Sequence, residues 1–194
     1  VHSIRKGALV LKKGTPIGDA EIAALRAAGV SEIVVAKLEP GDVSEDRSAR
    51  EIAAAAAGGG VRVDAAFTGR CNLFAEHAGV LVVDVAAINR LNRIDEAVTF
   101  ATLPAFAPVE EGRMIATAKI IPFAVPAAVH DAAVAAAGAL VRVAPYRVKK
   151  VGVISTLLPG LVDKIVEKTL KVTRQRLAPA GAEIVFERRI EHAA

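Results

Sequence analysis

The sequence predicts an α/β protein with two parts. A mixed α+β domain with a β-rich portion covers residues 1–147, and a βαβ unit that begins a second, three-layer α/β domain covers residues 148–194. Strand-type and helix-type segments alternate along the first part, and Thr, Val, Ile and Phe are concentrated between residues 98 and 126. A strand, a loop, an amphipathic helix and a second strand follow one another at the end.

The composition is that of a folded globular chain without a membrane span. Its 194 residues are 53% hydrophobic, which is enough for a substantial core. The most apolar run, residues 120–141, is interrupted by Pro122, Pro126, His130 and Asp131, whereas a spanning helix needs about 20 apolar residues. Residues 1–14 lack the apolar stretch of a secretory signal, so we expect a cytoplasmic protein. Because it opens on Val1, the chain is a candidate fragment of a longer polypeptide.

The formal charge of +4 is concentrated at one end. Residues 1–148 carry 16 Lys and Arg against 16 Asp and Glu, whereas residues 149–194 carry nine against five. Any anion that binds through the field of the protein is therefore expected at the C-terminal end.

The first part begins with alternating strands and helices. We predict a strand and a turn at 7–14, a helix at 19–29 with Asp19 as N-cap and Gly29 as its end, and a strand at 31–38. A helix capped by Ser44 is expected at 45–57, ending at the three glycines 58–60.

The remainder of this part is predicted to be richer in strands. Strands are expected at 61–67 and 80–85, with an irregular or helical stretch 69–79 between them and a helix at 86–97. The β-rich block 98–126 is expected to contain a hairpin that turns near Gly112. A helix at 127–138, a strand at 139–146 and a connector at 147–150 complete the first part.

The C-terminal part has the cleanest pattern. It predicts a strand at 149–155, a loop at 156–160, a helix at 161–181 and a strand at 182–189. The predicted helix has a buried stripe and an exposed stripe. The buried stripe comprises Val162, Val166, Leu170 and Leu177, and the exposed one Lys164, Lys168, Lys171 and Gln175.

The loop after the first strand of this unit is a candidate ligand site. Ligands of open α/β sheets lie beyond the carboxyl ends of the strands, where loop amides and helix N-termini meet. Ser155, Thr156 and Gly160 are expected there, at the point where the strand is predicted to stop. The alternative is that Ser155 and Thr156 merely end the strand. The loop has neither the GxGxxG nor the GxxxxGK[ST] pattern.

Several stretches carry a family resemblance. The strand "VGVIST", the helix containing "EKT" and the turn "GAEIV" resemble the opening of a molybdopterin-binding domain of the MoeA/MogA type. Upstream, "KKGTPI" before a helix ending in "AAGV" is similar to MoeA-like proteins, and "VEEGRMIATAKIIPFAV" is similar to their β-rich parts. The resemblance is closest to bacterial molybdopterin-binding proteins in which this module can be followed by a nucleotidyltransferase domain.

The resemblance implies a phosphorylated pterin-dithiolene ligand, either molybdopterin or its adenylylated form. Ser155 and Thr156 match the Ser-Thr pair of the family, and Thr169 is a weaker match to a hydroxyl residue of its first helix. Residues 157–159, Leu-Leu-Pro, replace the family's G-[DS]-E-L and remove an acidic residue. The sequence lacks the family's glycine-rich GGTG loop and the aspartates after it, so half of a binding site is expected.

We therefore expect a protein that binds a molybdopterin-type cofactor during molybdenum cofactor biosynthesis. Catalysis would be nucleotidyl transfer or metal insertion, and both would require Mg²⁺ held by carboxylates that the sequence does not identify. The alternative is a non-catalytic module for assembly or homo-oligomerisation. Nucleic-acid binding is a more distant alternative, through a row of basic residues comprising Lys164, Lys168, Lys171 and Arg174.

Other chemistry-bearing residues are better explained by structure. Cys71 and His77 lie six apart, which does not place them on one helical face, and a lone cysteine forms no internal disulfide. The four histidines have no metal-binding spacing. One group of acidic residues has the residue types that a turn followed by a helix cap requires. Two arginines are explained equally well by a solvated surface and by contact with an anion. The acidic group is Asp42, Glu45 and Asp46, and the arginines are Arg70 and Arg93.

Overall fold

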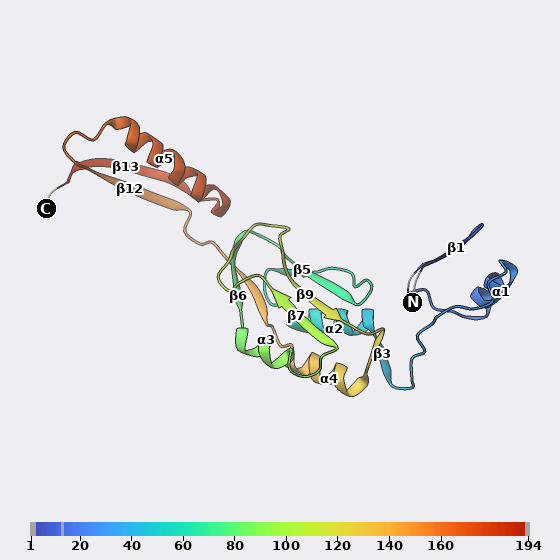
Figure 1. Ribbon diagram of the computed structural model, residues 1–194. Helices are drawn as coiled ribbons and strands as arrows, with labels where there is room; N and C mark the ends of the chain where they lie inside the picture. The colour runs from blue at the N-terminus through green and yellow to red at the C-terminus, as the bar shows by residue number, and fades with distance from the viewer. Residues whose placement is uncertain (1–2, 13, 193–194) are drawn as a thin grey trace.

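A computed structural model describes residues 3–12 and 14–192. Helices and strands are mixed throughout, which confirms the α/β class. Figure 1 shows an N-terminal group, a larger central group and a C-terminal group of elements, joined by extended segments. The predicted boundary between residues 147 and 148 falls in the second of these segments, residues 146–149, which have no regular structure.

The N-terminal group is a hairpin followed by a helix. β1 (Ile4–Lys6) pairs antiparallel with β2 (Leu9–Leu11), and the chain turns between them at Gly7, which has a φ of +59°. The strand and turn predicted at 7–14 are confirmed by β2 and by the hydrogen bond of 3.1 Å from the Thr15 N–H to the Lys12 carbonyl, whereas β1 was not predicted. α1 (Asp19–Ala27) has Gly18 rather than Asp19 at its N-cap position. Glu21 accepts a hydrogen bond of 2.9 Å from the Gly18 N–H, and Gly29 takes a positive φ beyond the end of the helix.

The strand predicted at 31–38 is absent. Residues 30–39 form no regular element, and the side chains of Val34 and Val35 are 71% and 53% exposed. β-branched residues favour a strand only where a neighbouring strand and a buried face are present, and this segment has neither in the described structure.

The main sheet of the central group has four antiparallel strands in the order β4-β5-β9-β7. α2 (Glu45–Ala56) packs on β5 and β9 and covers one face of this sheet. The stretch 69–79, predicted to be irregular or helical, instead contains β5, because its buried residues alternate with more exposed ones. The strands are β4 (Val61–Val63), β5 (Arg70–Ala75), β9 (Met114–Ile120) and β7 (Val98–Thr102).

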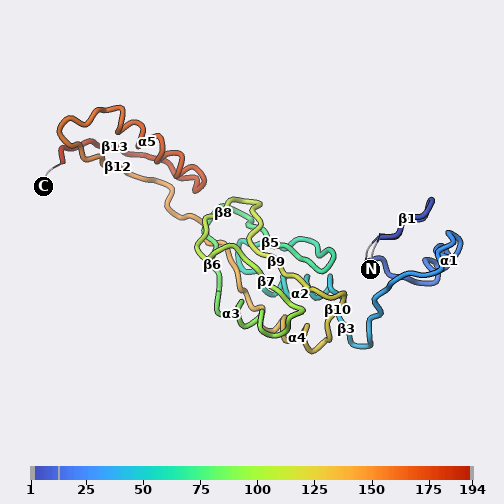
Figure 2. The backbone as a smooth tube through the Cα atoms, in the orientation of Figure 1, coloured from blue at the N-terminus to red at the C-terminus, as the bar shows by residue number. Residues whose placement is uncertain are grey.

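Two smaller sheets complete the central group, and four of their strands, β3, β6, β8 and β10, are labelled in Figure 2. One sheet has the order β11-β6-β8, and the other pairs β3 with β10. The hairpin predicted near Gly112 is wrong: β8 pairs with β6, whereas β9 pairs with β5 and β7, so the turn at Gly112 joins two sheets. The strands are β3 (Asp42–Ser44), β6 (Gly79–Val83), β8 (Pro108–Val109), β10 (Ala124–Pro126) and β11 (Val141–Pro145).

Two further helices close the central core. α3 (Val85–Leu91) is capped by Asp84, which accepts a 2.9 Å hydrogen bond from the Ala87 N–H, and it ends earlier than the predicted residue 97. Directly after the helix, the Asn92 side chain accepts a hydrogen bond of 2.7 Å from the Phe100 N–H and donates one of 2.9 Å to the Phe100 carbonyl in β7. α4 (Ala127–Ala136) packs on α2 and α3. The largest fully buried side chains include Ile52, Leu73, Leu81, Leu91, Phe100 and Ile115.

The C-terminal group is a βαβ unit. β12 (Lys150–Leu157) and β13 (Glu183–Glu191) are parallel, and α5 (Asp163–Leu177) connects them through a short 3-10 helix, Ala178–Ala180. Val166 and Leu170 of α5 are buried and its lysines are exposed, as predicted, but Val162 is 59% exposed. The unit has two layers, a sheet and one helix, so the third layer stays a prediction.

β12 does not stop where the sequence predicts. Ser155 and Thr156 lie within the strand and pair with β13, and the strand ends at Leu157. The physical reason is that hydroxyl residues fit a strand as long as their backbone is paired with a neighbour.

No helix within residues 3–12 and 14–192 combines the length and the apolar character needed to cross a bilayer. This agrees with the prediction from the interrupted apolar run.

Candidate functional site

Ser155 and Thr156 are brought to the C-terminal end of β12, but they face opposite sides of the sheet. Successive side chains of a strand alternate between its two faces. Ser155 is opposite Arg189 of β13, and Thr156 is opposite Ile190. Ser155 is half-buried on the face that α5 covers, whereas Thr156 is exposed on the other face. A single ligand on the helix side is therefore accessible to Ser155 and not to Thr156.

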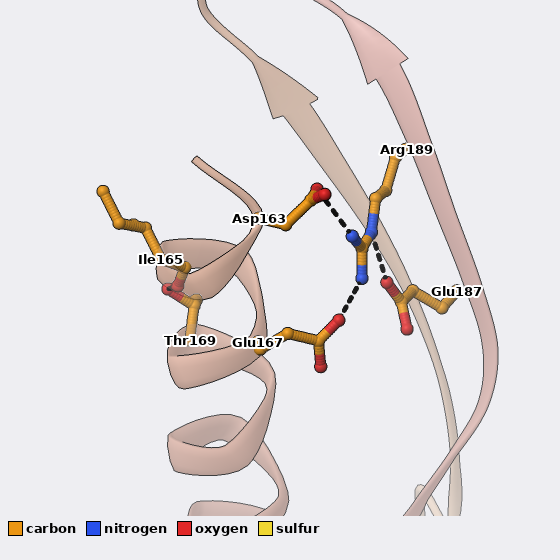
Figure 3. Close-up of polar contacts among 6 residues, drawn as sticks. All are labelled: Asp163, Ile165, Glu167, Thr169, Glu187 and Arg189. Atoms are coloured by element: carbon orange, nitrogen blue, oxygen red, sulfur yellow. Dashed lines mark hydrogen bonds and ion pairs between the residues drawn. The ribbon is translucent and has the colours of Figure 1, made fainter. Parts of the chain in front are cut away.

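Arg189 organises the face beneath α5. Its guanidinium bonds Asp163 and Glu187, each at 3.0 Å, and also Glu167 (Figure 3). Asp163 and Glu167 belong to the first turns of α5, so Arg189 ties the start of the helix to β13. The hydrogen bonds that Arg189 donates to the carboxylates of Glu167 and Glu187 raise the pKa of Arg189 above its ordinary value.

The loop between β12 and α5 ends in a helix N-terminus that lacks a side-chain cap. Gly160 has a φ of +79°, and Val162 occupies the N-cap position, where its apolar side chain cannot accept a hydrogen bond. The Ile165 N–H donates to the carbonyl of Val162 at 3.0 Å. Backbone N–H groups at the first turn of a helix attract anions, although the Asp163 carboxylate lies in the same turn.

Thr169 is not part of this arrangement. Its hydroxyl donates to the carbonyl of Ile165 at 3.0 Å, a bond within the helix itself. Figure 3 shows Thr169 and Ile165 on the side of α5 away from Arg189. The structure thus brings Ser155 and Gly160 to the same end of the sheet and places Thr156 and Thr169 on other surfaces.

Within the described part of the chain, no group of three His, Cys, Asp or Glu side chains is arranged to hold a metal ion. The three carboxylates around Arg189 are instead bonded to its guanidinium.

Cys71 and His77 do not form a pair. Cys71 is buried in β5, and its Sγ lies 3.3 Å from the carbonyl of Asp64. Burial raises the pKa of the Cys71 thiol, and the nearby Asp64 charge adds to the effect. Nδ1 of His77 lies 3.1 Å from the carbonyl of Ala78. The structure thus gives Cys71 the environment of an unreactive core thiol.

A buried polar cluster joins α2 and α4, and sequence analysis missed it. Nδ1 of His130 lies 3.1 Å from the Ser48 hydroxyl, and its Nε2 lies 2.9 Å from Glu51 Oε2. Ser48 is fully buried, so its hydroxyl cannot meet a substrate, and the cluster holds the two helices together. The only sequence signal is the spacing of Ser48 and Glu51, three residues apart on one helix face.

The acidic group near the start of α2 serves the fold. Asp42 accepts a 2.9 Å hydrogen bond from the Glu39 N–H, and Asp46 accepts one of 2.7 Å from the Gly69 N–H. The Asp42 bond agrees with the expectation of a turn residue, whereas Asp46, in the first turn of α2, bonds a loop residue 23 positions away.

No protein-family model, curated protein or solved structure was found to match this chain.

Proposed function

We propose that the C-terminal βαβ unit binds the phosphate of a molybdopterin-type ligand during molybdenum cofactor biosynthesis. The observation that supports this proposal best is the uncapped N-terminus of α5, which follows the carboxyl end of β12 in a unit with parallel strands. An anion at that position would meet unsatisfied backbone N–H groups and the positive end of the helix dipole. The family resemblance supplies the identity of the ligand.

The residues present fit one side of such a ligand. The loop N–H groups around Gly160 and the first turn of α5 would bind the phosphate, and the Ser155 hydroxyl would donate a further hydrogen bond. Arg189 offsets the negative charge of Asp163, which would otherwise repel an anion. Thr156 and Thr169 belong to the set that the resemblance implies, but their positions on other surfaces give them less support. The dithiolene sulfurs of the ligand would carry its molybdenum.

In this proposal the chain binds the ligand, and catalysis is carried out by a larger assembly. Nucleotidyl transfer to the pterin phosphate, or insertion of molybdenum, would need Mg²⁺ and carboxylates to hold it. The part of the chain described here supplies binding groups. The adenylylated form of molybdopterin is the second ligand to test.

Calorimetric titration of the 194-residue chain with molybdopterin, its adenylylated form and inorganic phosphate tests the proposal. We expect molybdopterin to bind more tightly than phosphate alone, and Gly160→Pro to weaken binding because it removes an N–H and forces a negative φ. The matched control is Pro in place of exposed Gly59, which lies far along the chain in the central group. No measurable molybdopterin binding by the folded chain would refute the proposal.

A second candidate function, assembly through self-association, is supported by a different observation. The face of β12 and β13 opposite α5 carries Ile154, Phe186 and Ile190, which are 60%, 49% and 40% exposed. Parallel sheets are almost always covered on both faces. A second copy of the chain would cover this face by packing sheet against sheet.

Light scattering after size-exclusion chromatography tests whether the chain self-associates. Self-association predicts a dimer that Ile154→Lys dissociates and that Ile165→Lys, a change of the same kind on exposed α5, leaves intact. A monomer at all accessible concentrations would exclude it.

A further inference from the structure

The outer face of the main sheet in the central group carries two like charges side by side. Arg70 of β5 lies directly opposite Lys119 of β9 in the antiparallel register. Like charges in such a pair repel each other. Neither side chain forms an ion pair with a carboxylate in the described residues, so both keep donors that can bond a phosphate directly, while the carboxylates of Glu45 and Asp64, which line the same cavity, offset their charge.

Arg70 and Lys119 line this cavity, which has a volume of about 630 Å³. Asn72, two positions along β5 from Arg70, faces the same side of the sheet and also lines the cavity. Its Oδ1 is buried and has no hydrogen-bond partner in the described structure. A half-turn of the amide exchanges its oxygen and nitrogen, so Asn72 can offer either atom to a bound molecule.

The wall of the cavity is a rigid, strained turn. Phe67 and Arg70 bond each other across it through their backbones at 2.8 and 3.1 Å, and Thr68 has a φ of +49°. Gly69 fixes the turn to its surroundings: its N–H donates to Asp46, and its carbonyl accepts from the Ile120 N–H, both at 2.7 Å. Strained backbone that is held this firmly is common at ligand sites.

Phe67 and Asp64 add an apolar surface and an acceptor. The Phe67 side chain is 72% exposed at the edge of the cavity, where a flat ring could lie against it. The Asp64 side chain is half-exposed. One of its oxygens accepts a bond from the Ala65 N–H, and the other can accept N–H groups of a ligand. Glu45 also lines the cavity, next to Gly69.

We infer that this cavity binds a phosphorylated heterocycle with a 2-amino-4-oxopyrimidine ring, the chemistry shared by guanine nucleotides and phosphorylated pterins. Arg70 and Lys119 hold the phosphate, and Phe67 packs against the ring. Asp64 and Asn72 bond its N–H groups and oxygen. The site lies in the central group and does not depend on the function proposed for the βαβ unit.

Calorimetric titration of the full chain with named probes tests this inference. Guanosine 5′-monophosphate and neopterin monophosphate represent the two sources, and the tighter of them identifies the natural class. Adenosine 5′-monophosphate lacks the 2-amino-4-oxo pattern and guanosine lacks the phosphate. We expect both to bind at least about 10-fold more weakly than the tighter phosphorylated probe, because each loses hydrogen bonds to a charged group.

Variants locate the binding. Arg70→Gln and Lys119→Gln should each weaken binding of the better probe about 10-fold to 100-fold. Arg142→Gln removes the same charge from an exposed position of β11 and should leave binding unchanged. Absence of binding by both phosphorylated probes at millimolar concentration, equal binding of adenosine 5′-monophosphate, or equal loss in Arg142→Gln would overturn the inference. If a variant misfolds, the comparison of the four probes on the unmodified chain still tests the inference.

Discussion

Ser155 lies directly opposite Arg189 across the parallel strands β12 and β13, beneath the start of α5. Arg189 is bonded to two carboxylates of that helix, so the residues beside Ser155 set both the position of α5 and the charge at its N-terminus. The candidate site and the stability of the βαβ unit therefore share one side chain.

Replacing Arg189 should loosen the helix from the sheet. In Arg189→Gln the carboxylates of Asp163, Glu167 and Glu187 lose their common partner and repel one another. We expect a lower midpoint of thermal unfolding for the C-terminal unit and faster amide exchange in the first turns of α5. Arg188→Gln is the control, since Arg188 faces the uncovered side of the sheet. Equal exchange in α5 for both variants would show that the Arg189 contacts do not hold the helix.

Removing the imidazole of His130 should destabilise the central group. His130→Ala leaves the buried Ser48 hydroxyl and one oxygen of Glu51 without their partner, at a cost of about 1–3 kcal/mol in the free energy of unfolding. Urea unfolding followed by circular dichroism measures this. His77→Ala is the comparison, because His77 lies outside the cluster, and a loss as large in that variant would contradict the assignment.

Stability should also depend on pH through Glu51. A hydrogen bond from Arg47 lowers the pKa of Glu51 in the folded protein, with a smaller contribution from His130. A carboxyl whose folded pKa is depressed stabilises the fold above its unfolded pKa, and this stability is lost as the pH falls through the folded pKa. We expect Arg47→Gln to raise the pKa of Glu51, as measured by carboxyl NMR titration, and to make the acid loss of stability shallower. An unchanged Glu51 pKa would refute this.

Gly69 should tolerate no side chain. A Cβ there would lie 2.6 Å from Glu45 Oε2 and 2.6 Å from the carbonyl of Ile120, and the residue has a positive φ. Gly69→Ala should cost about 1–3 kcal/mol of the free energy of unfolding because of this strain. Gly59→Ala meets no atom within 4 Å and should leave stability nearly unchanged. Equal urea unfolding midpoints for Gly69→Ala and Gly59→Ala would contradict the role assigned to the turn at Gly69.

Local sequence patterns predicted most elements but few of their partners. The amphipathic helix α5 follows from the spacing of Val166, Leu170 and its lysines, and the order of the βαβ unit follows from the apolar runs around it. Whether a β-branched segment becomes a strand depends on distant residues. Residues 31–38 form no regular element among the residues that the structure describes, whereas β5 becomes a strand between β4 and β9.

The sites show the same limit. Sequence placed Ser155, Thr156 and Gly160 near one end of the unit, but it put the end of the strand two residues too early and so missed that Ser155 and Thr156 face opposite ways. The sequence alone indicates Arg70 only as a candidate anion contact. Its pairing with Lys119 depends on the register of strands 49 positions apart, which no local pattern contains.

Binding of molybdopterin to Ser155→Ala and to Thr156→Ala, measured by calorimetry on otherwise identical chains, tests the central claim most directly. The account predicts that Ser155→Ala weakens binding about 10-fold through loss of a hydrogen bond to the phosphate, while Thr156→Ala binds as the unmodified chain does. Unchanged binding in Ser155→Ala, or equal losses in both variants, would contradict a ligand bound on the α5 side of the sheet.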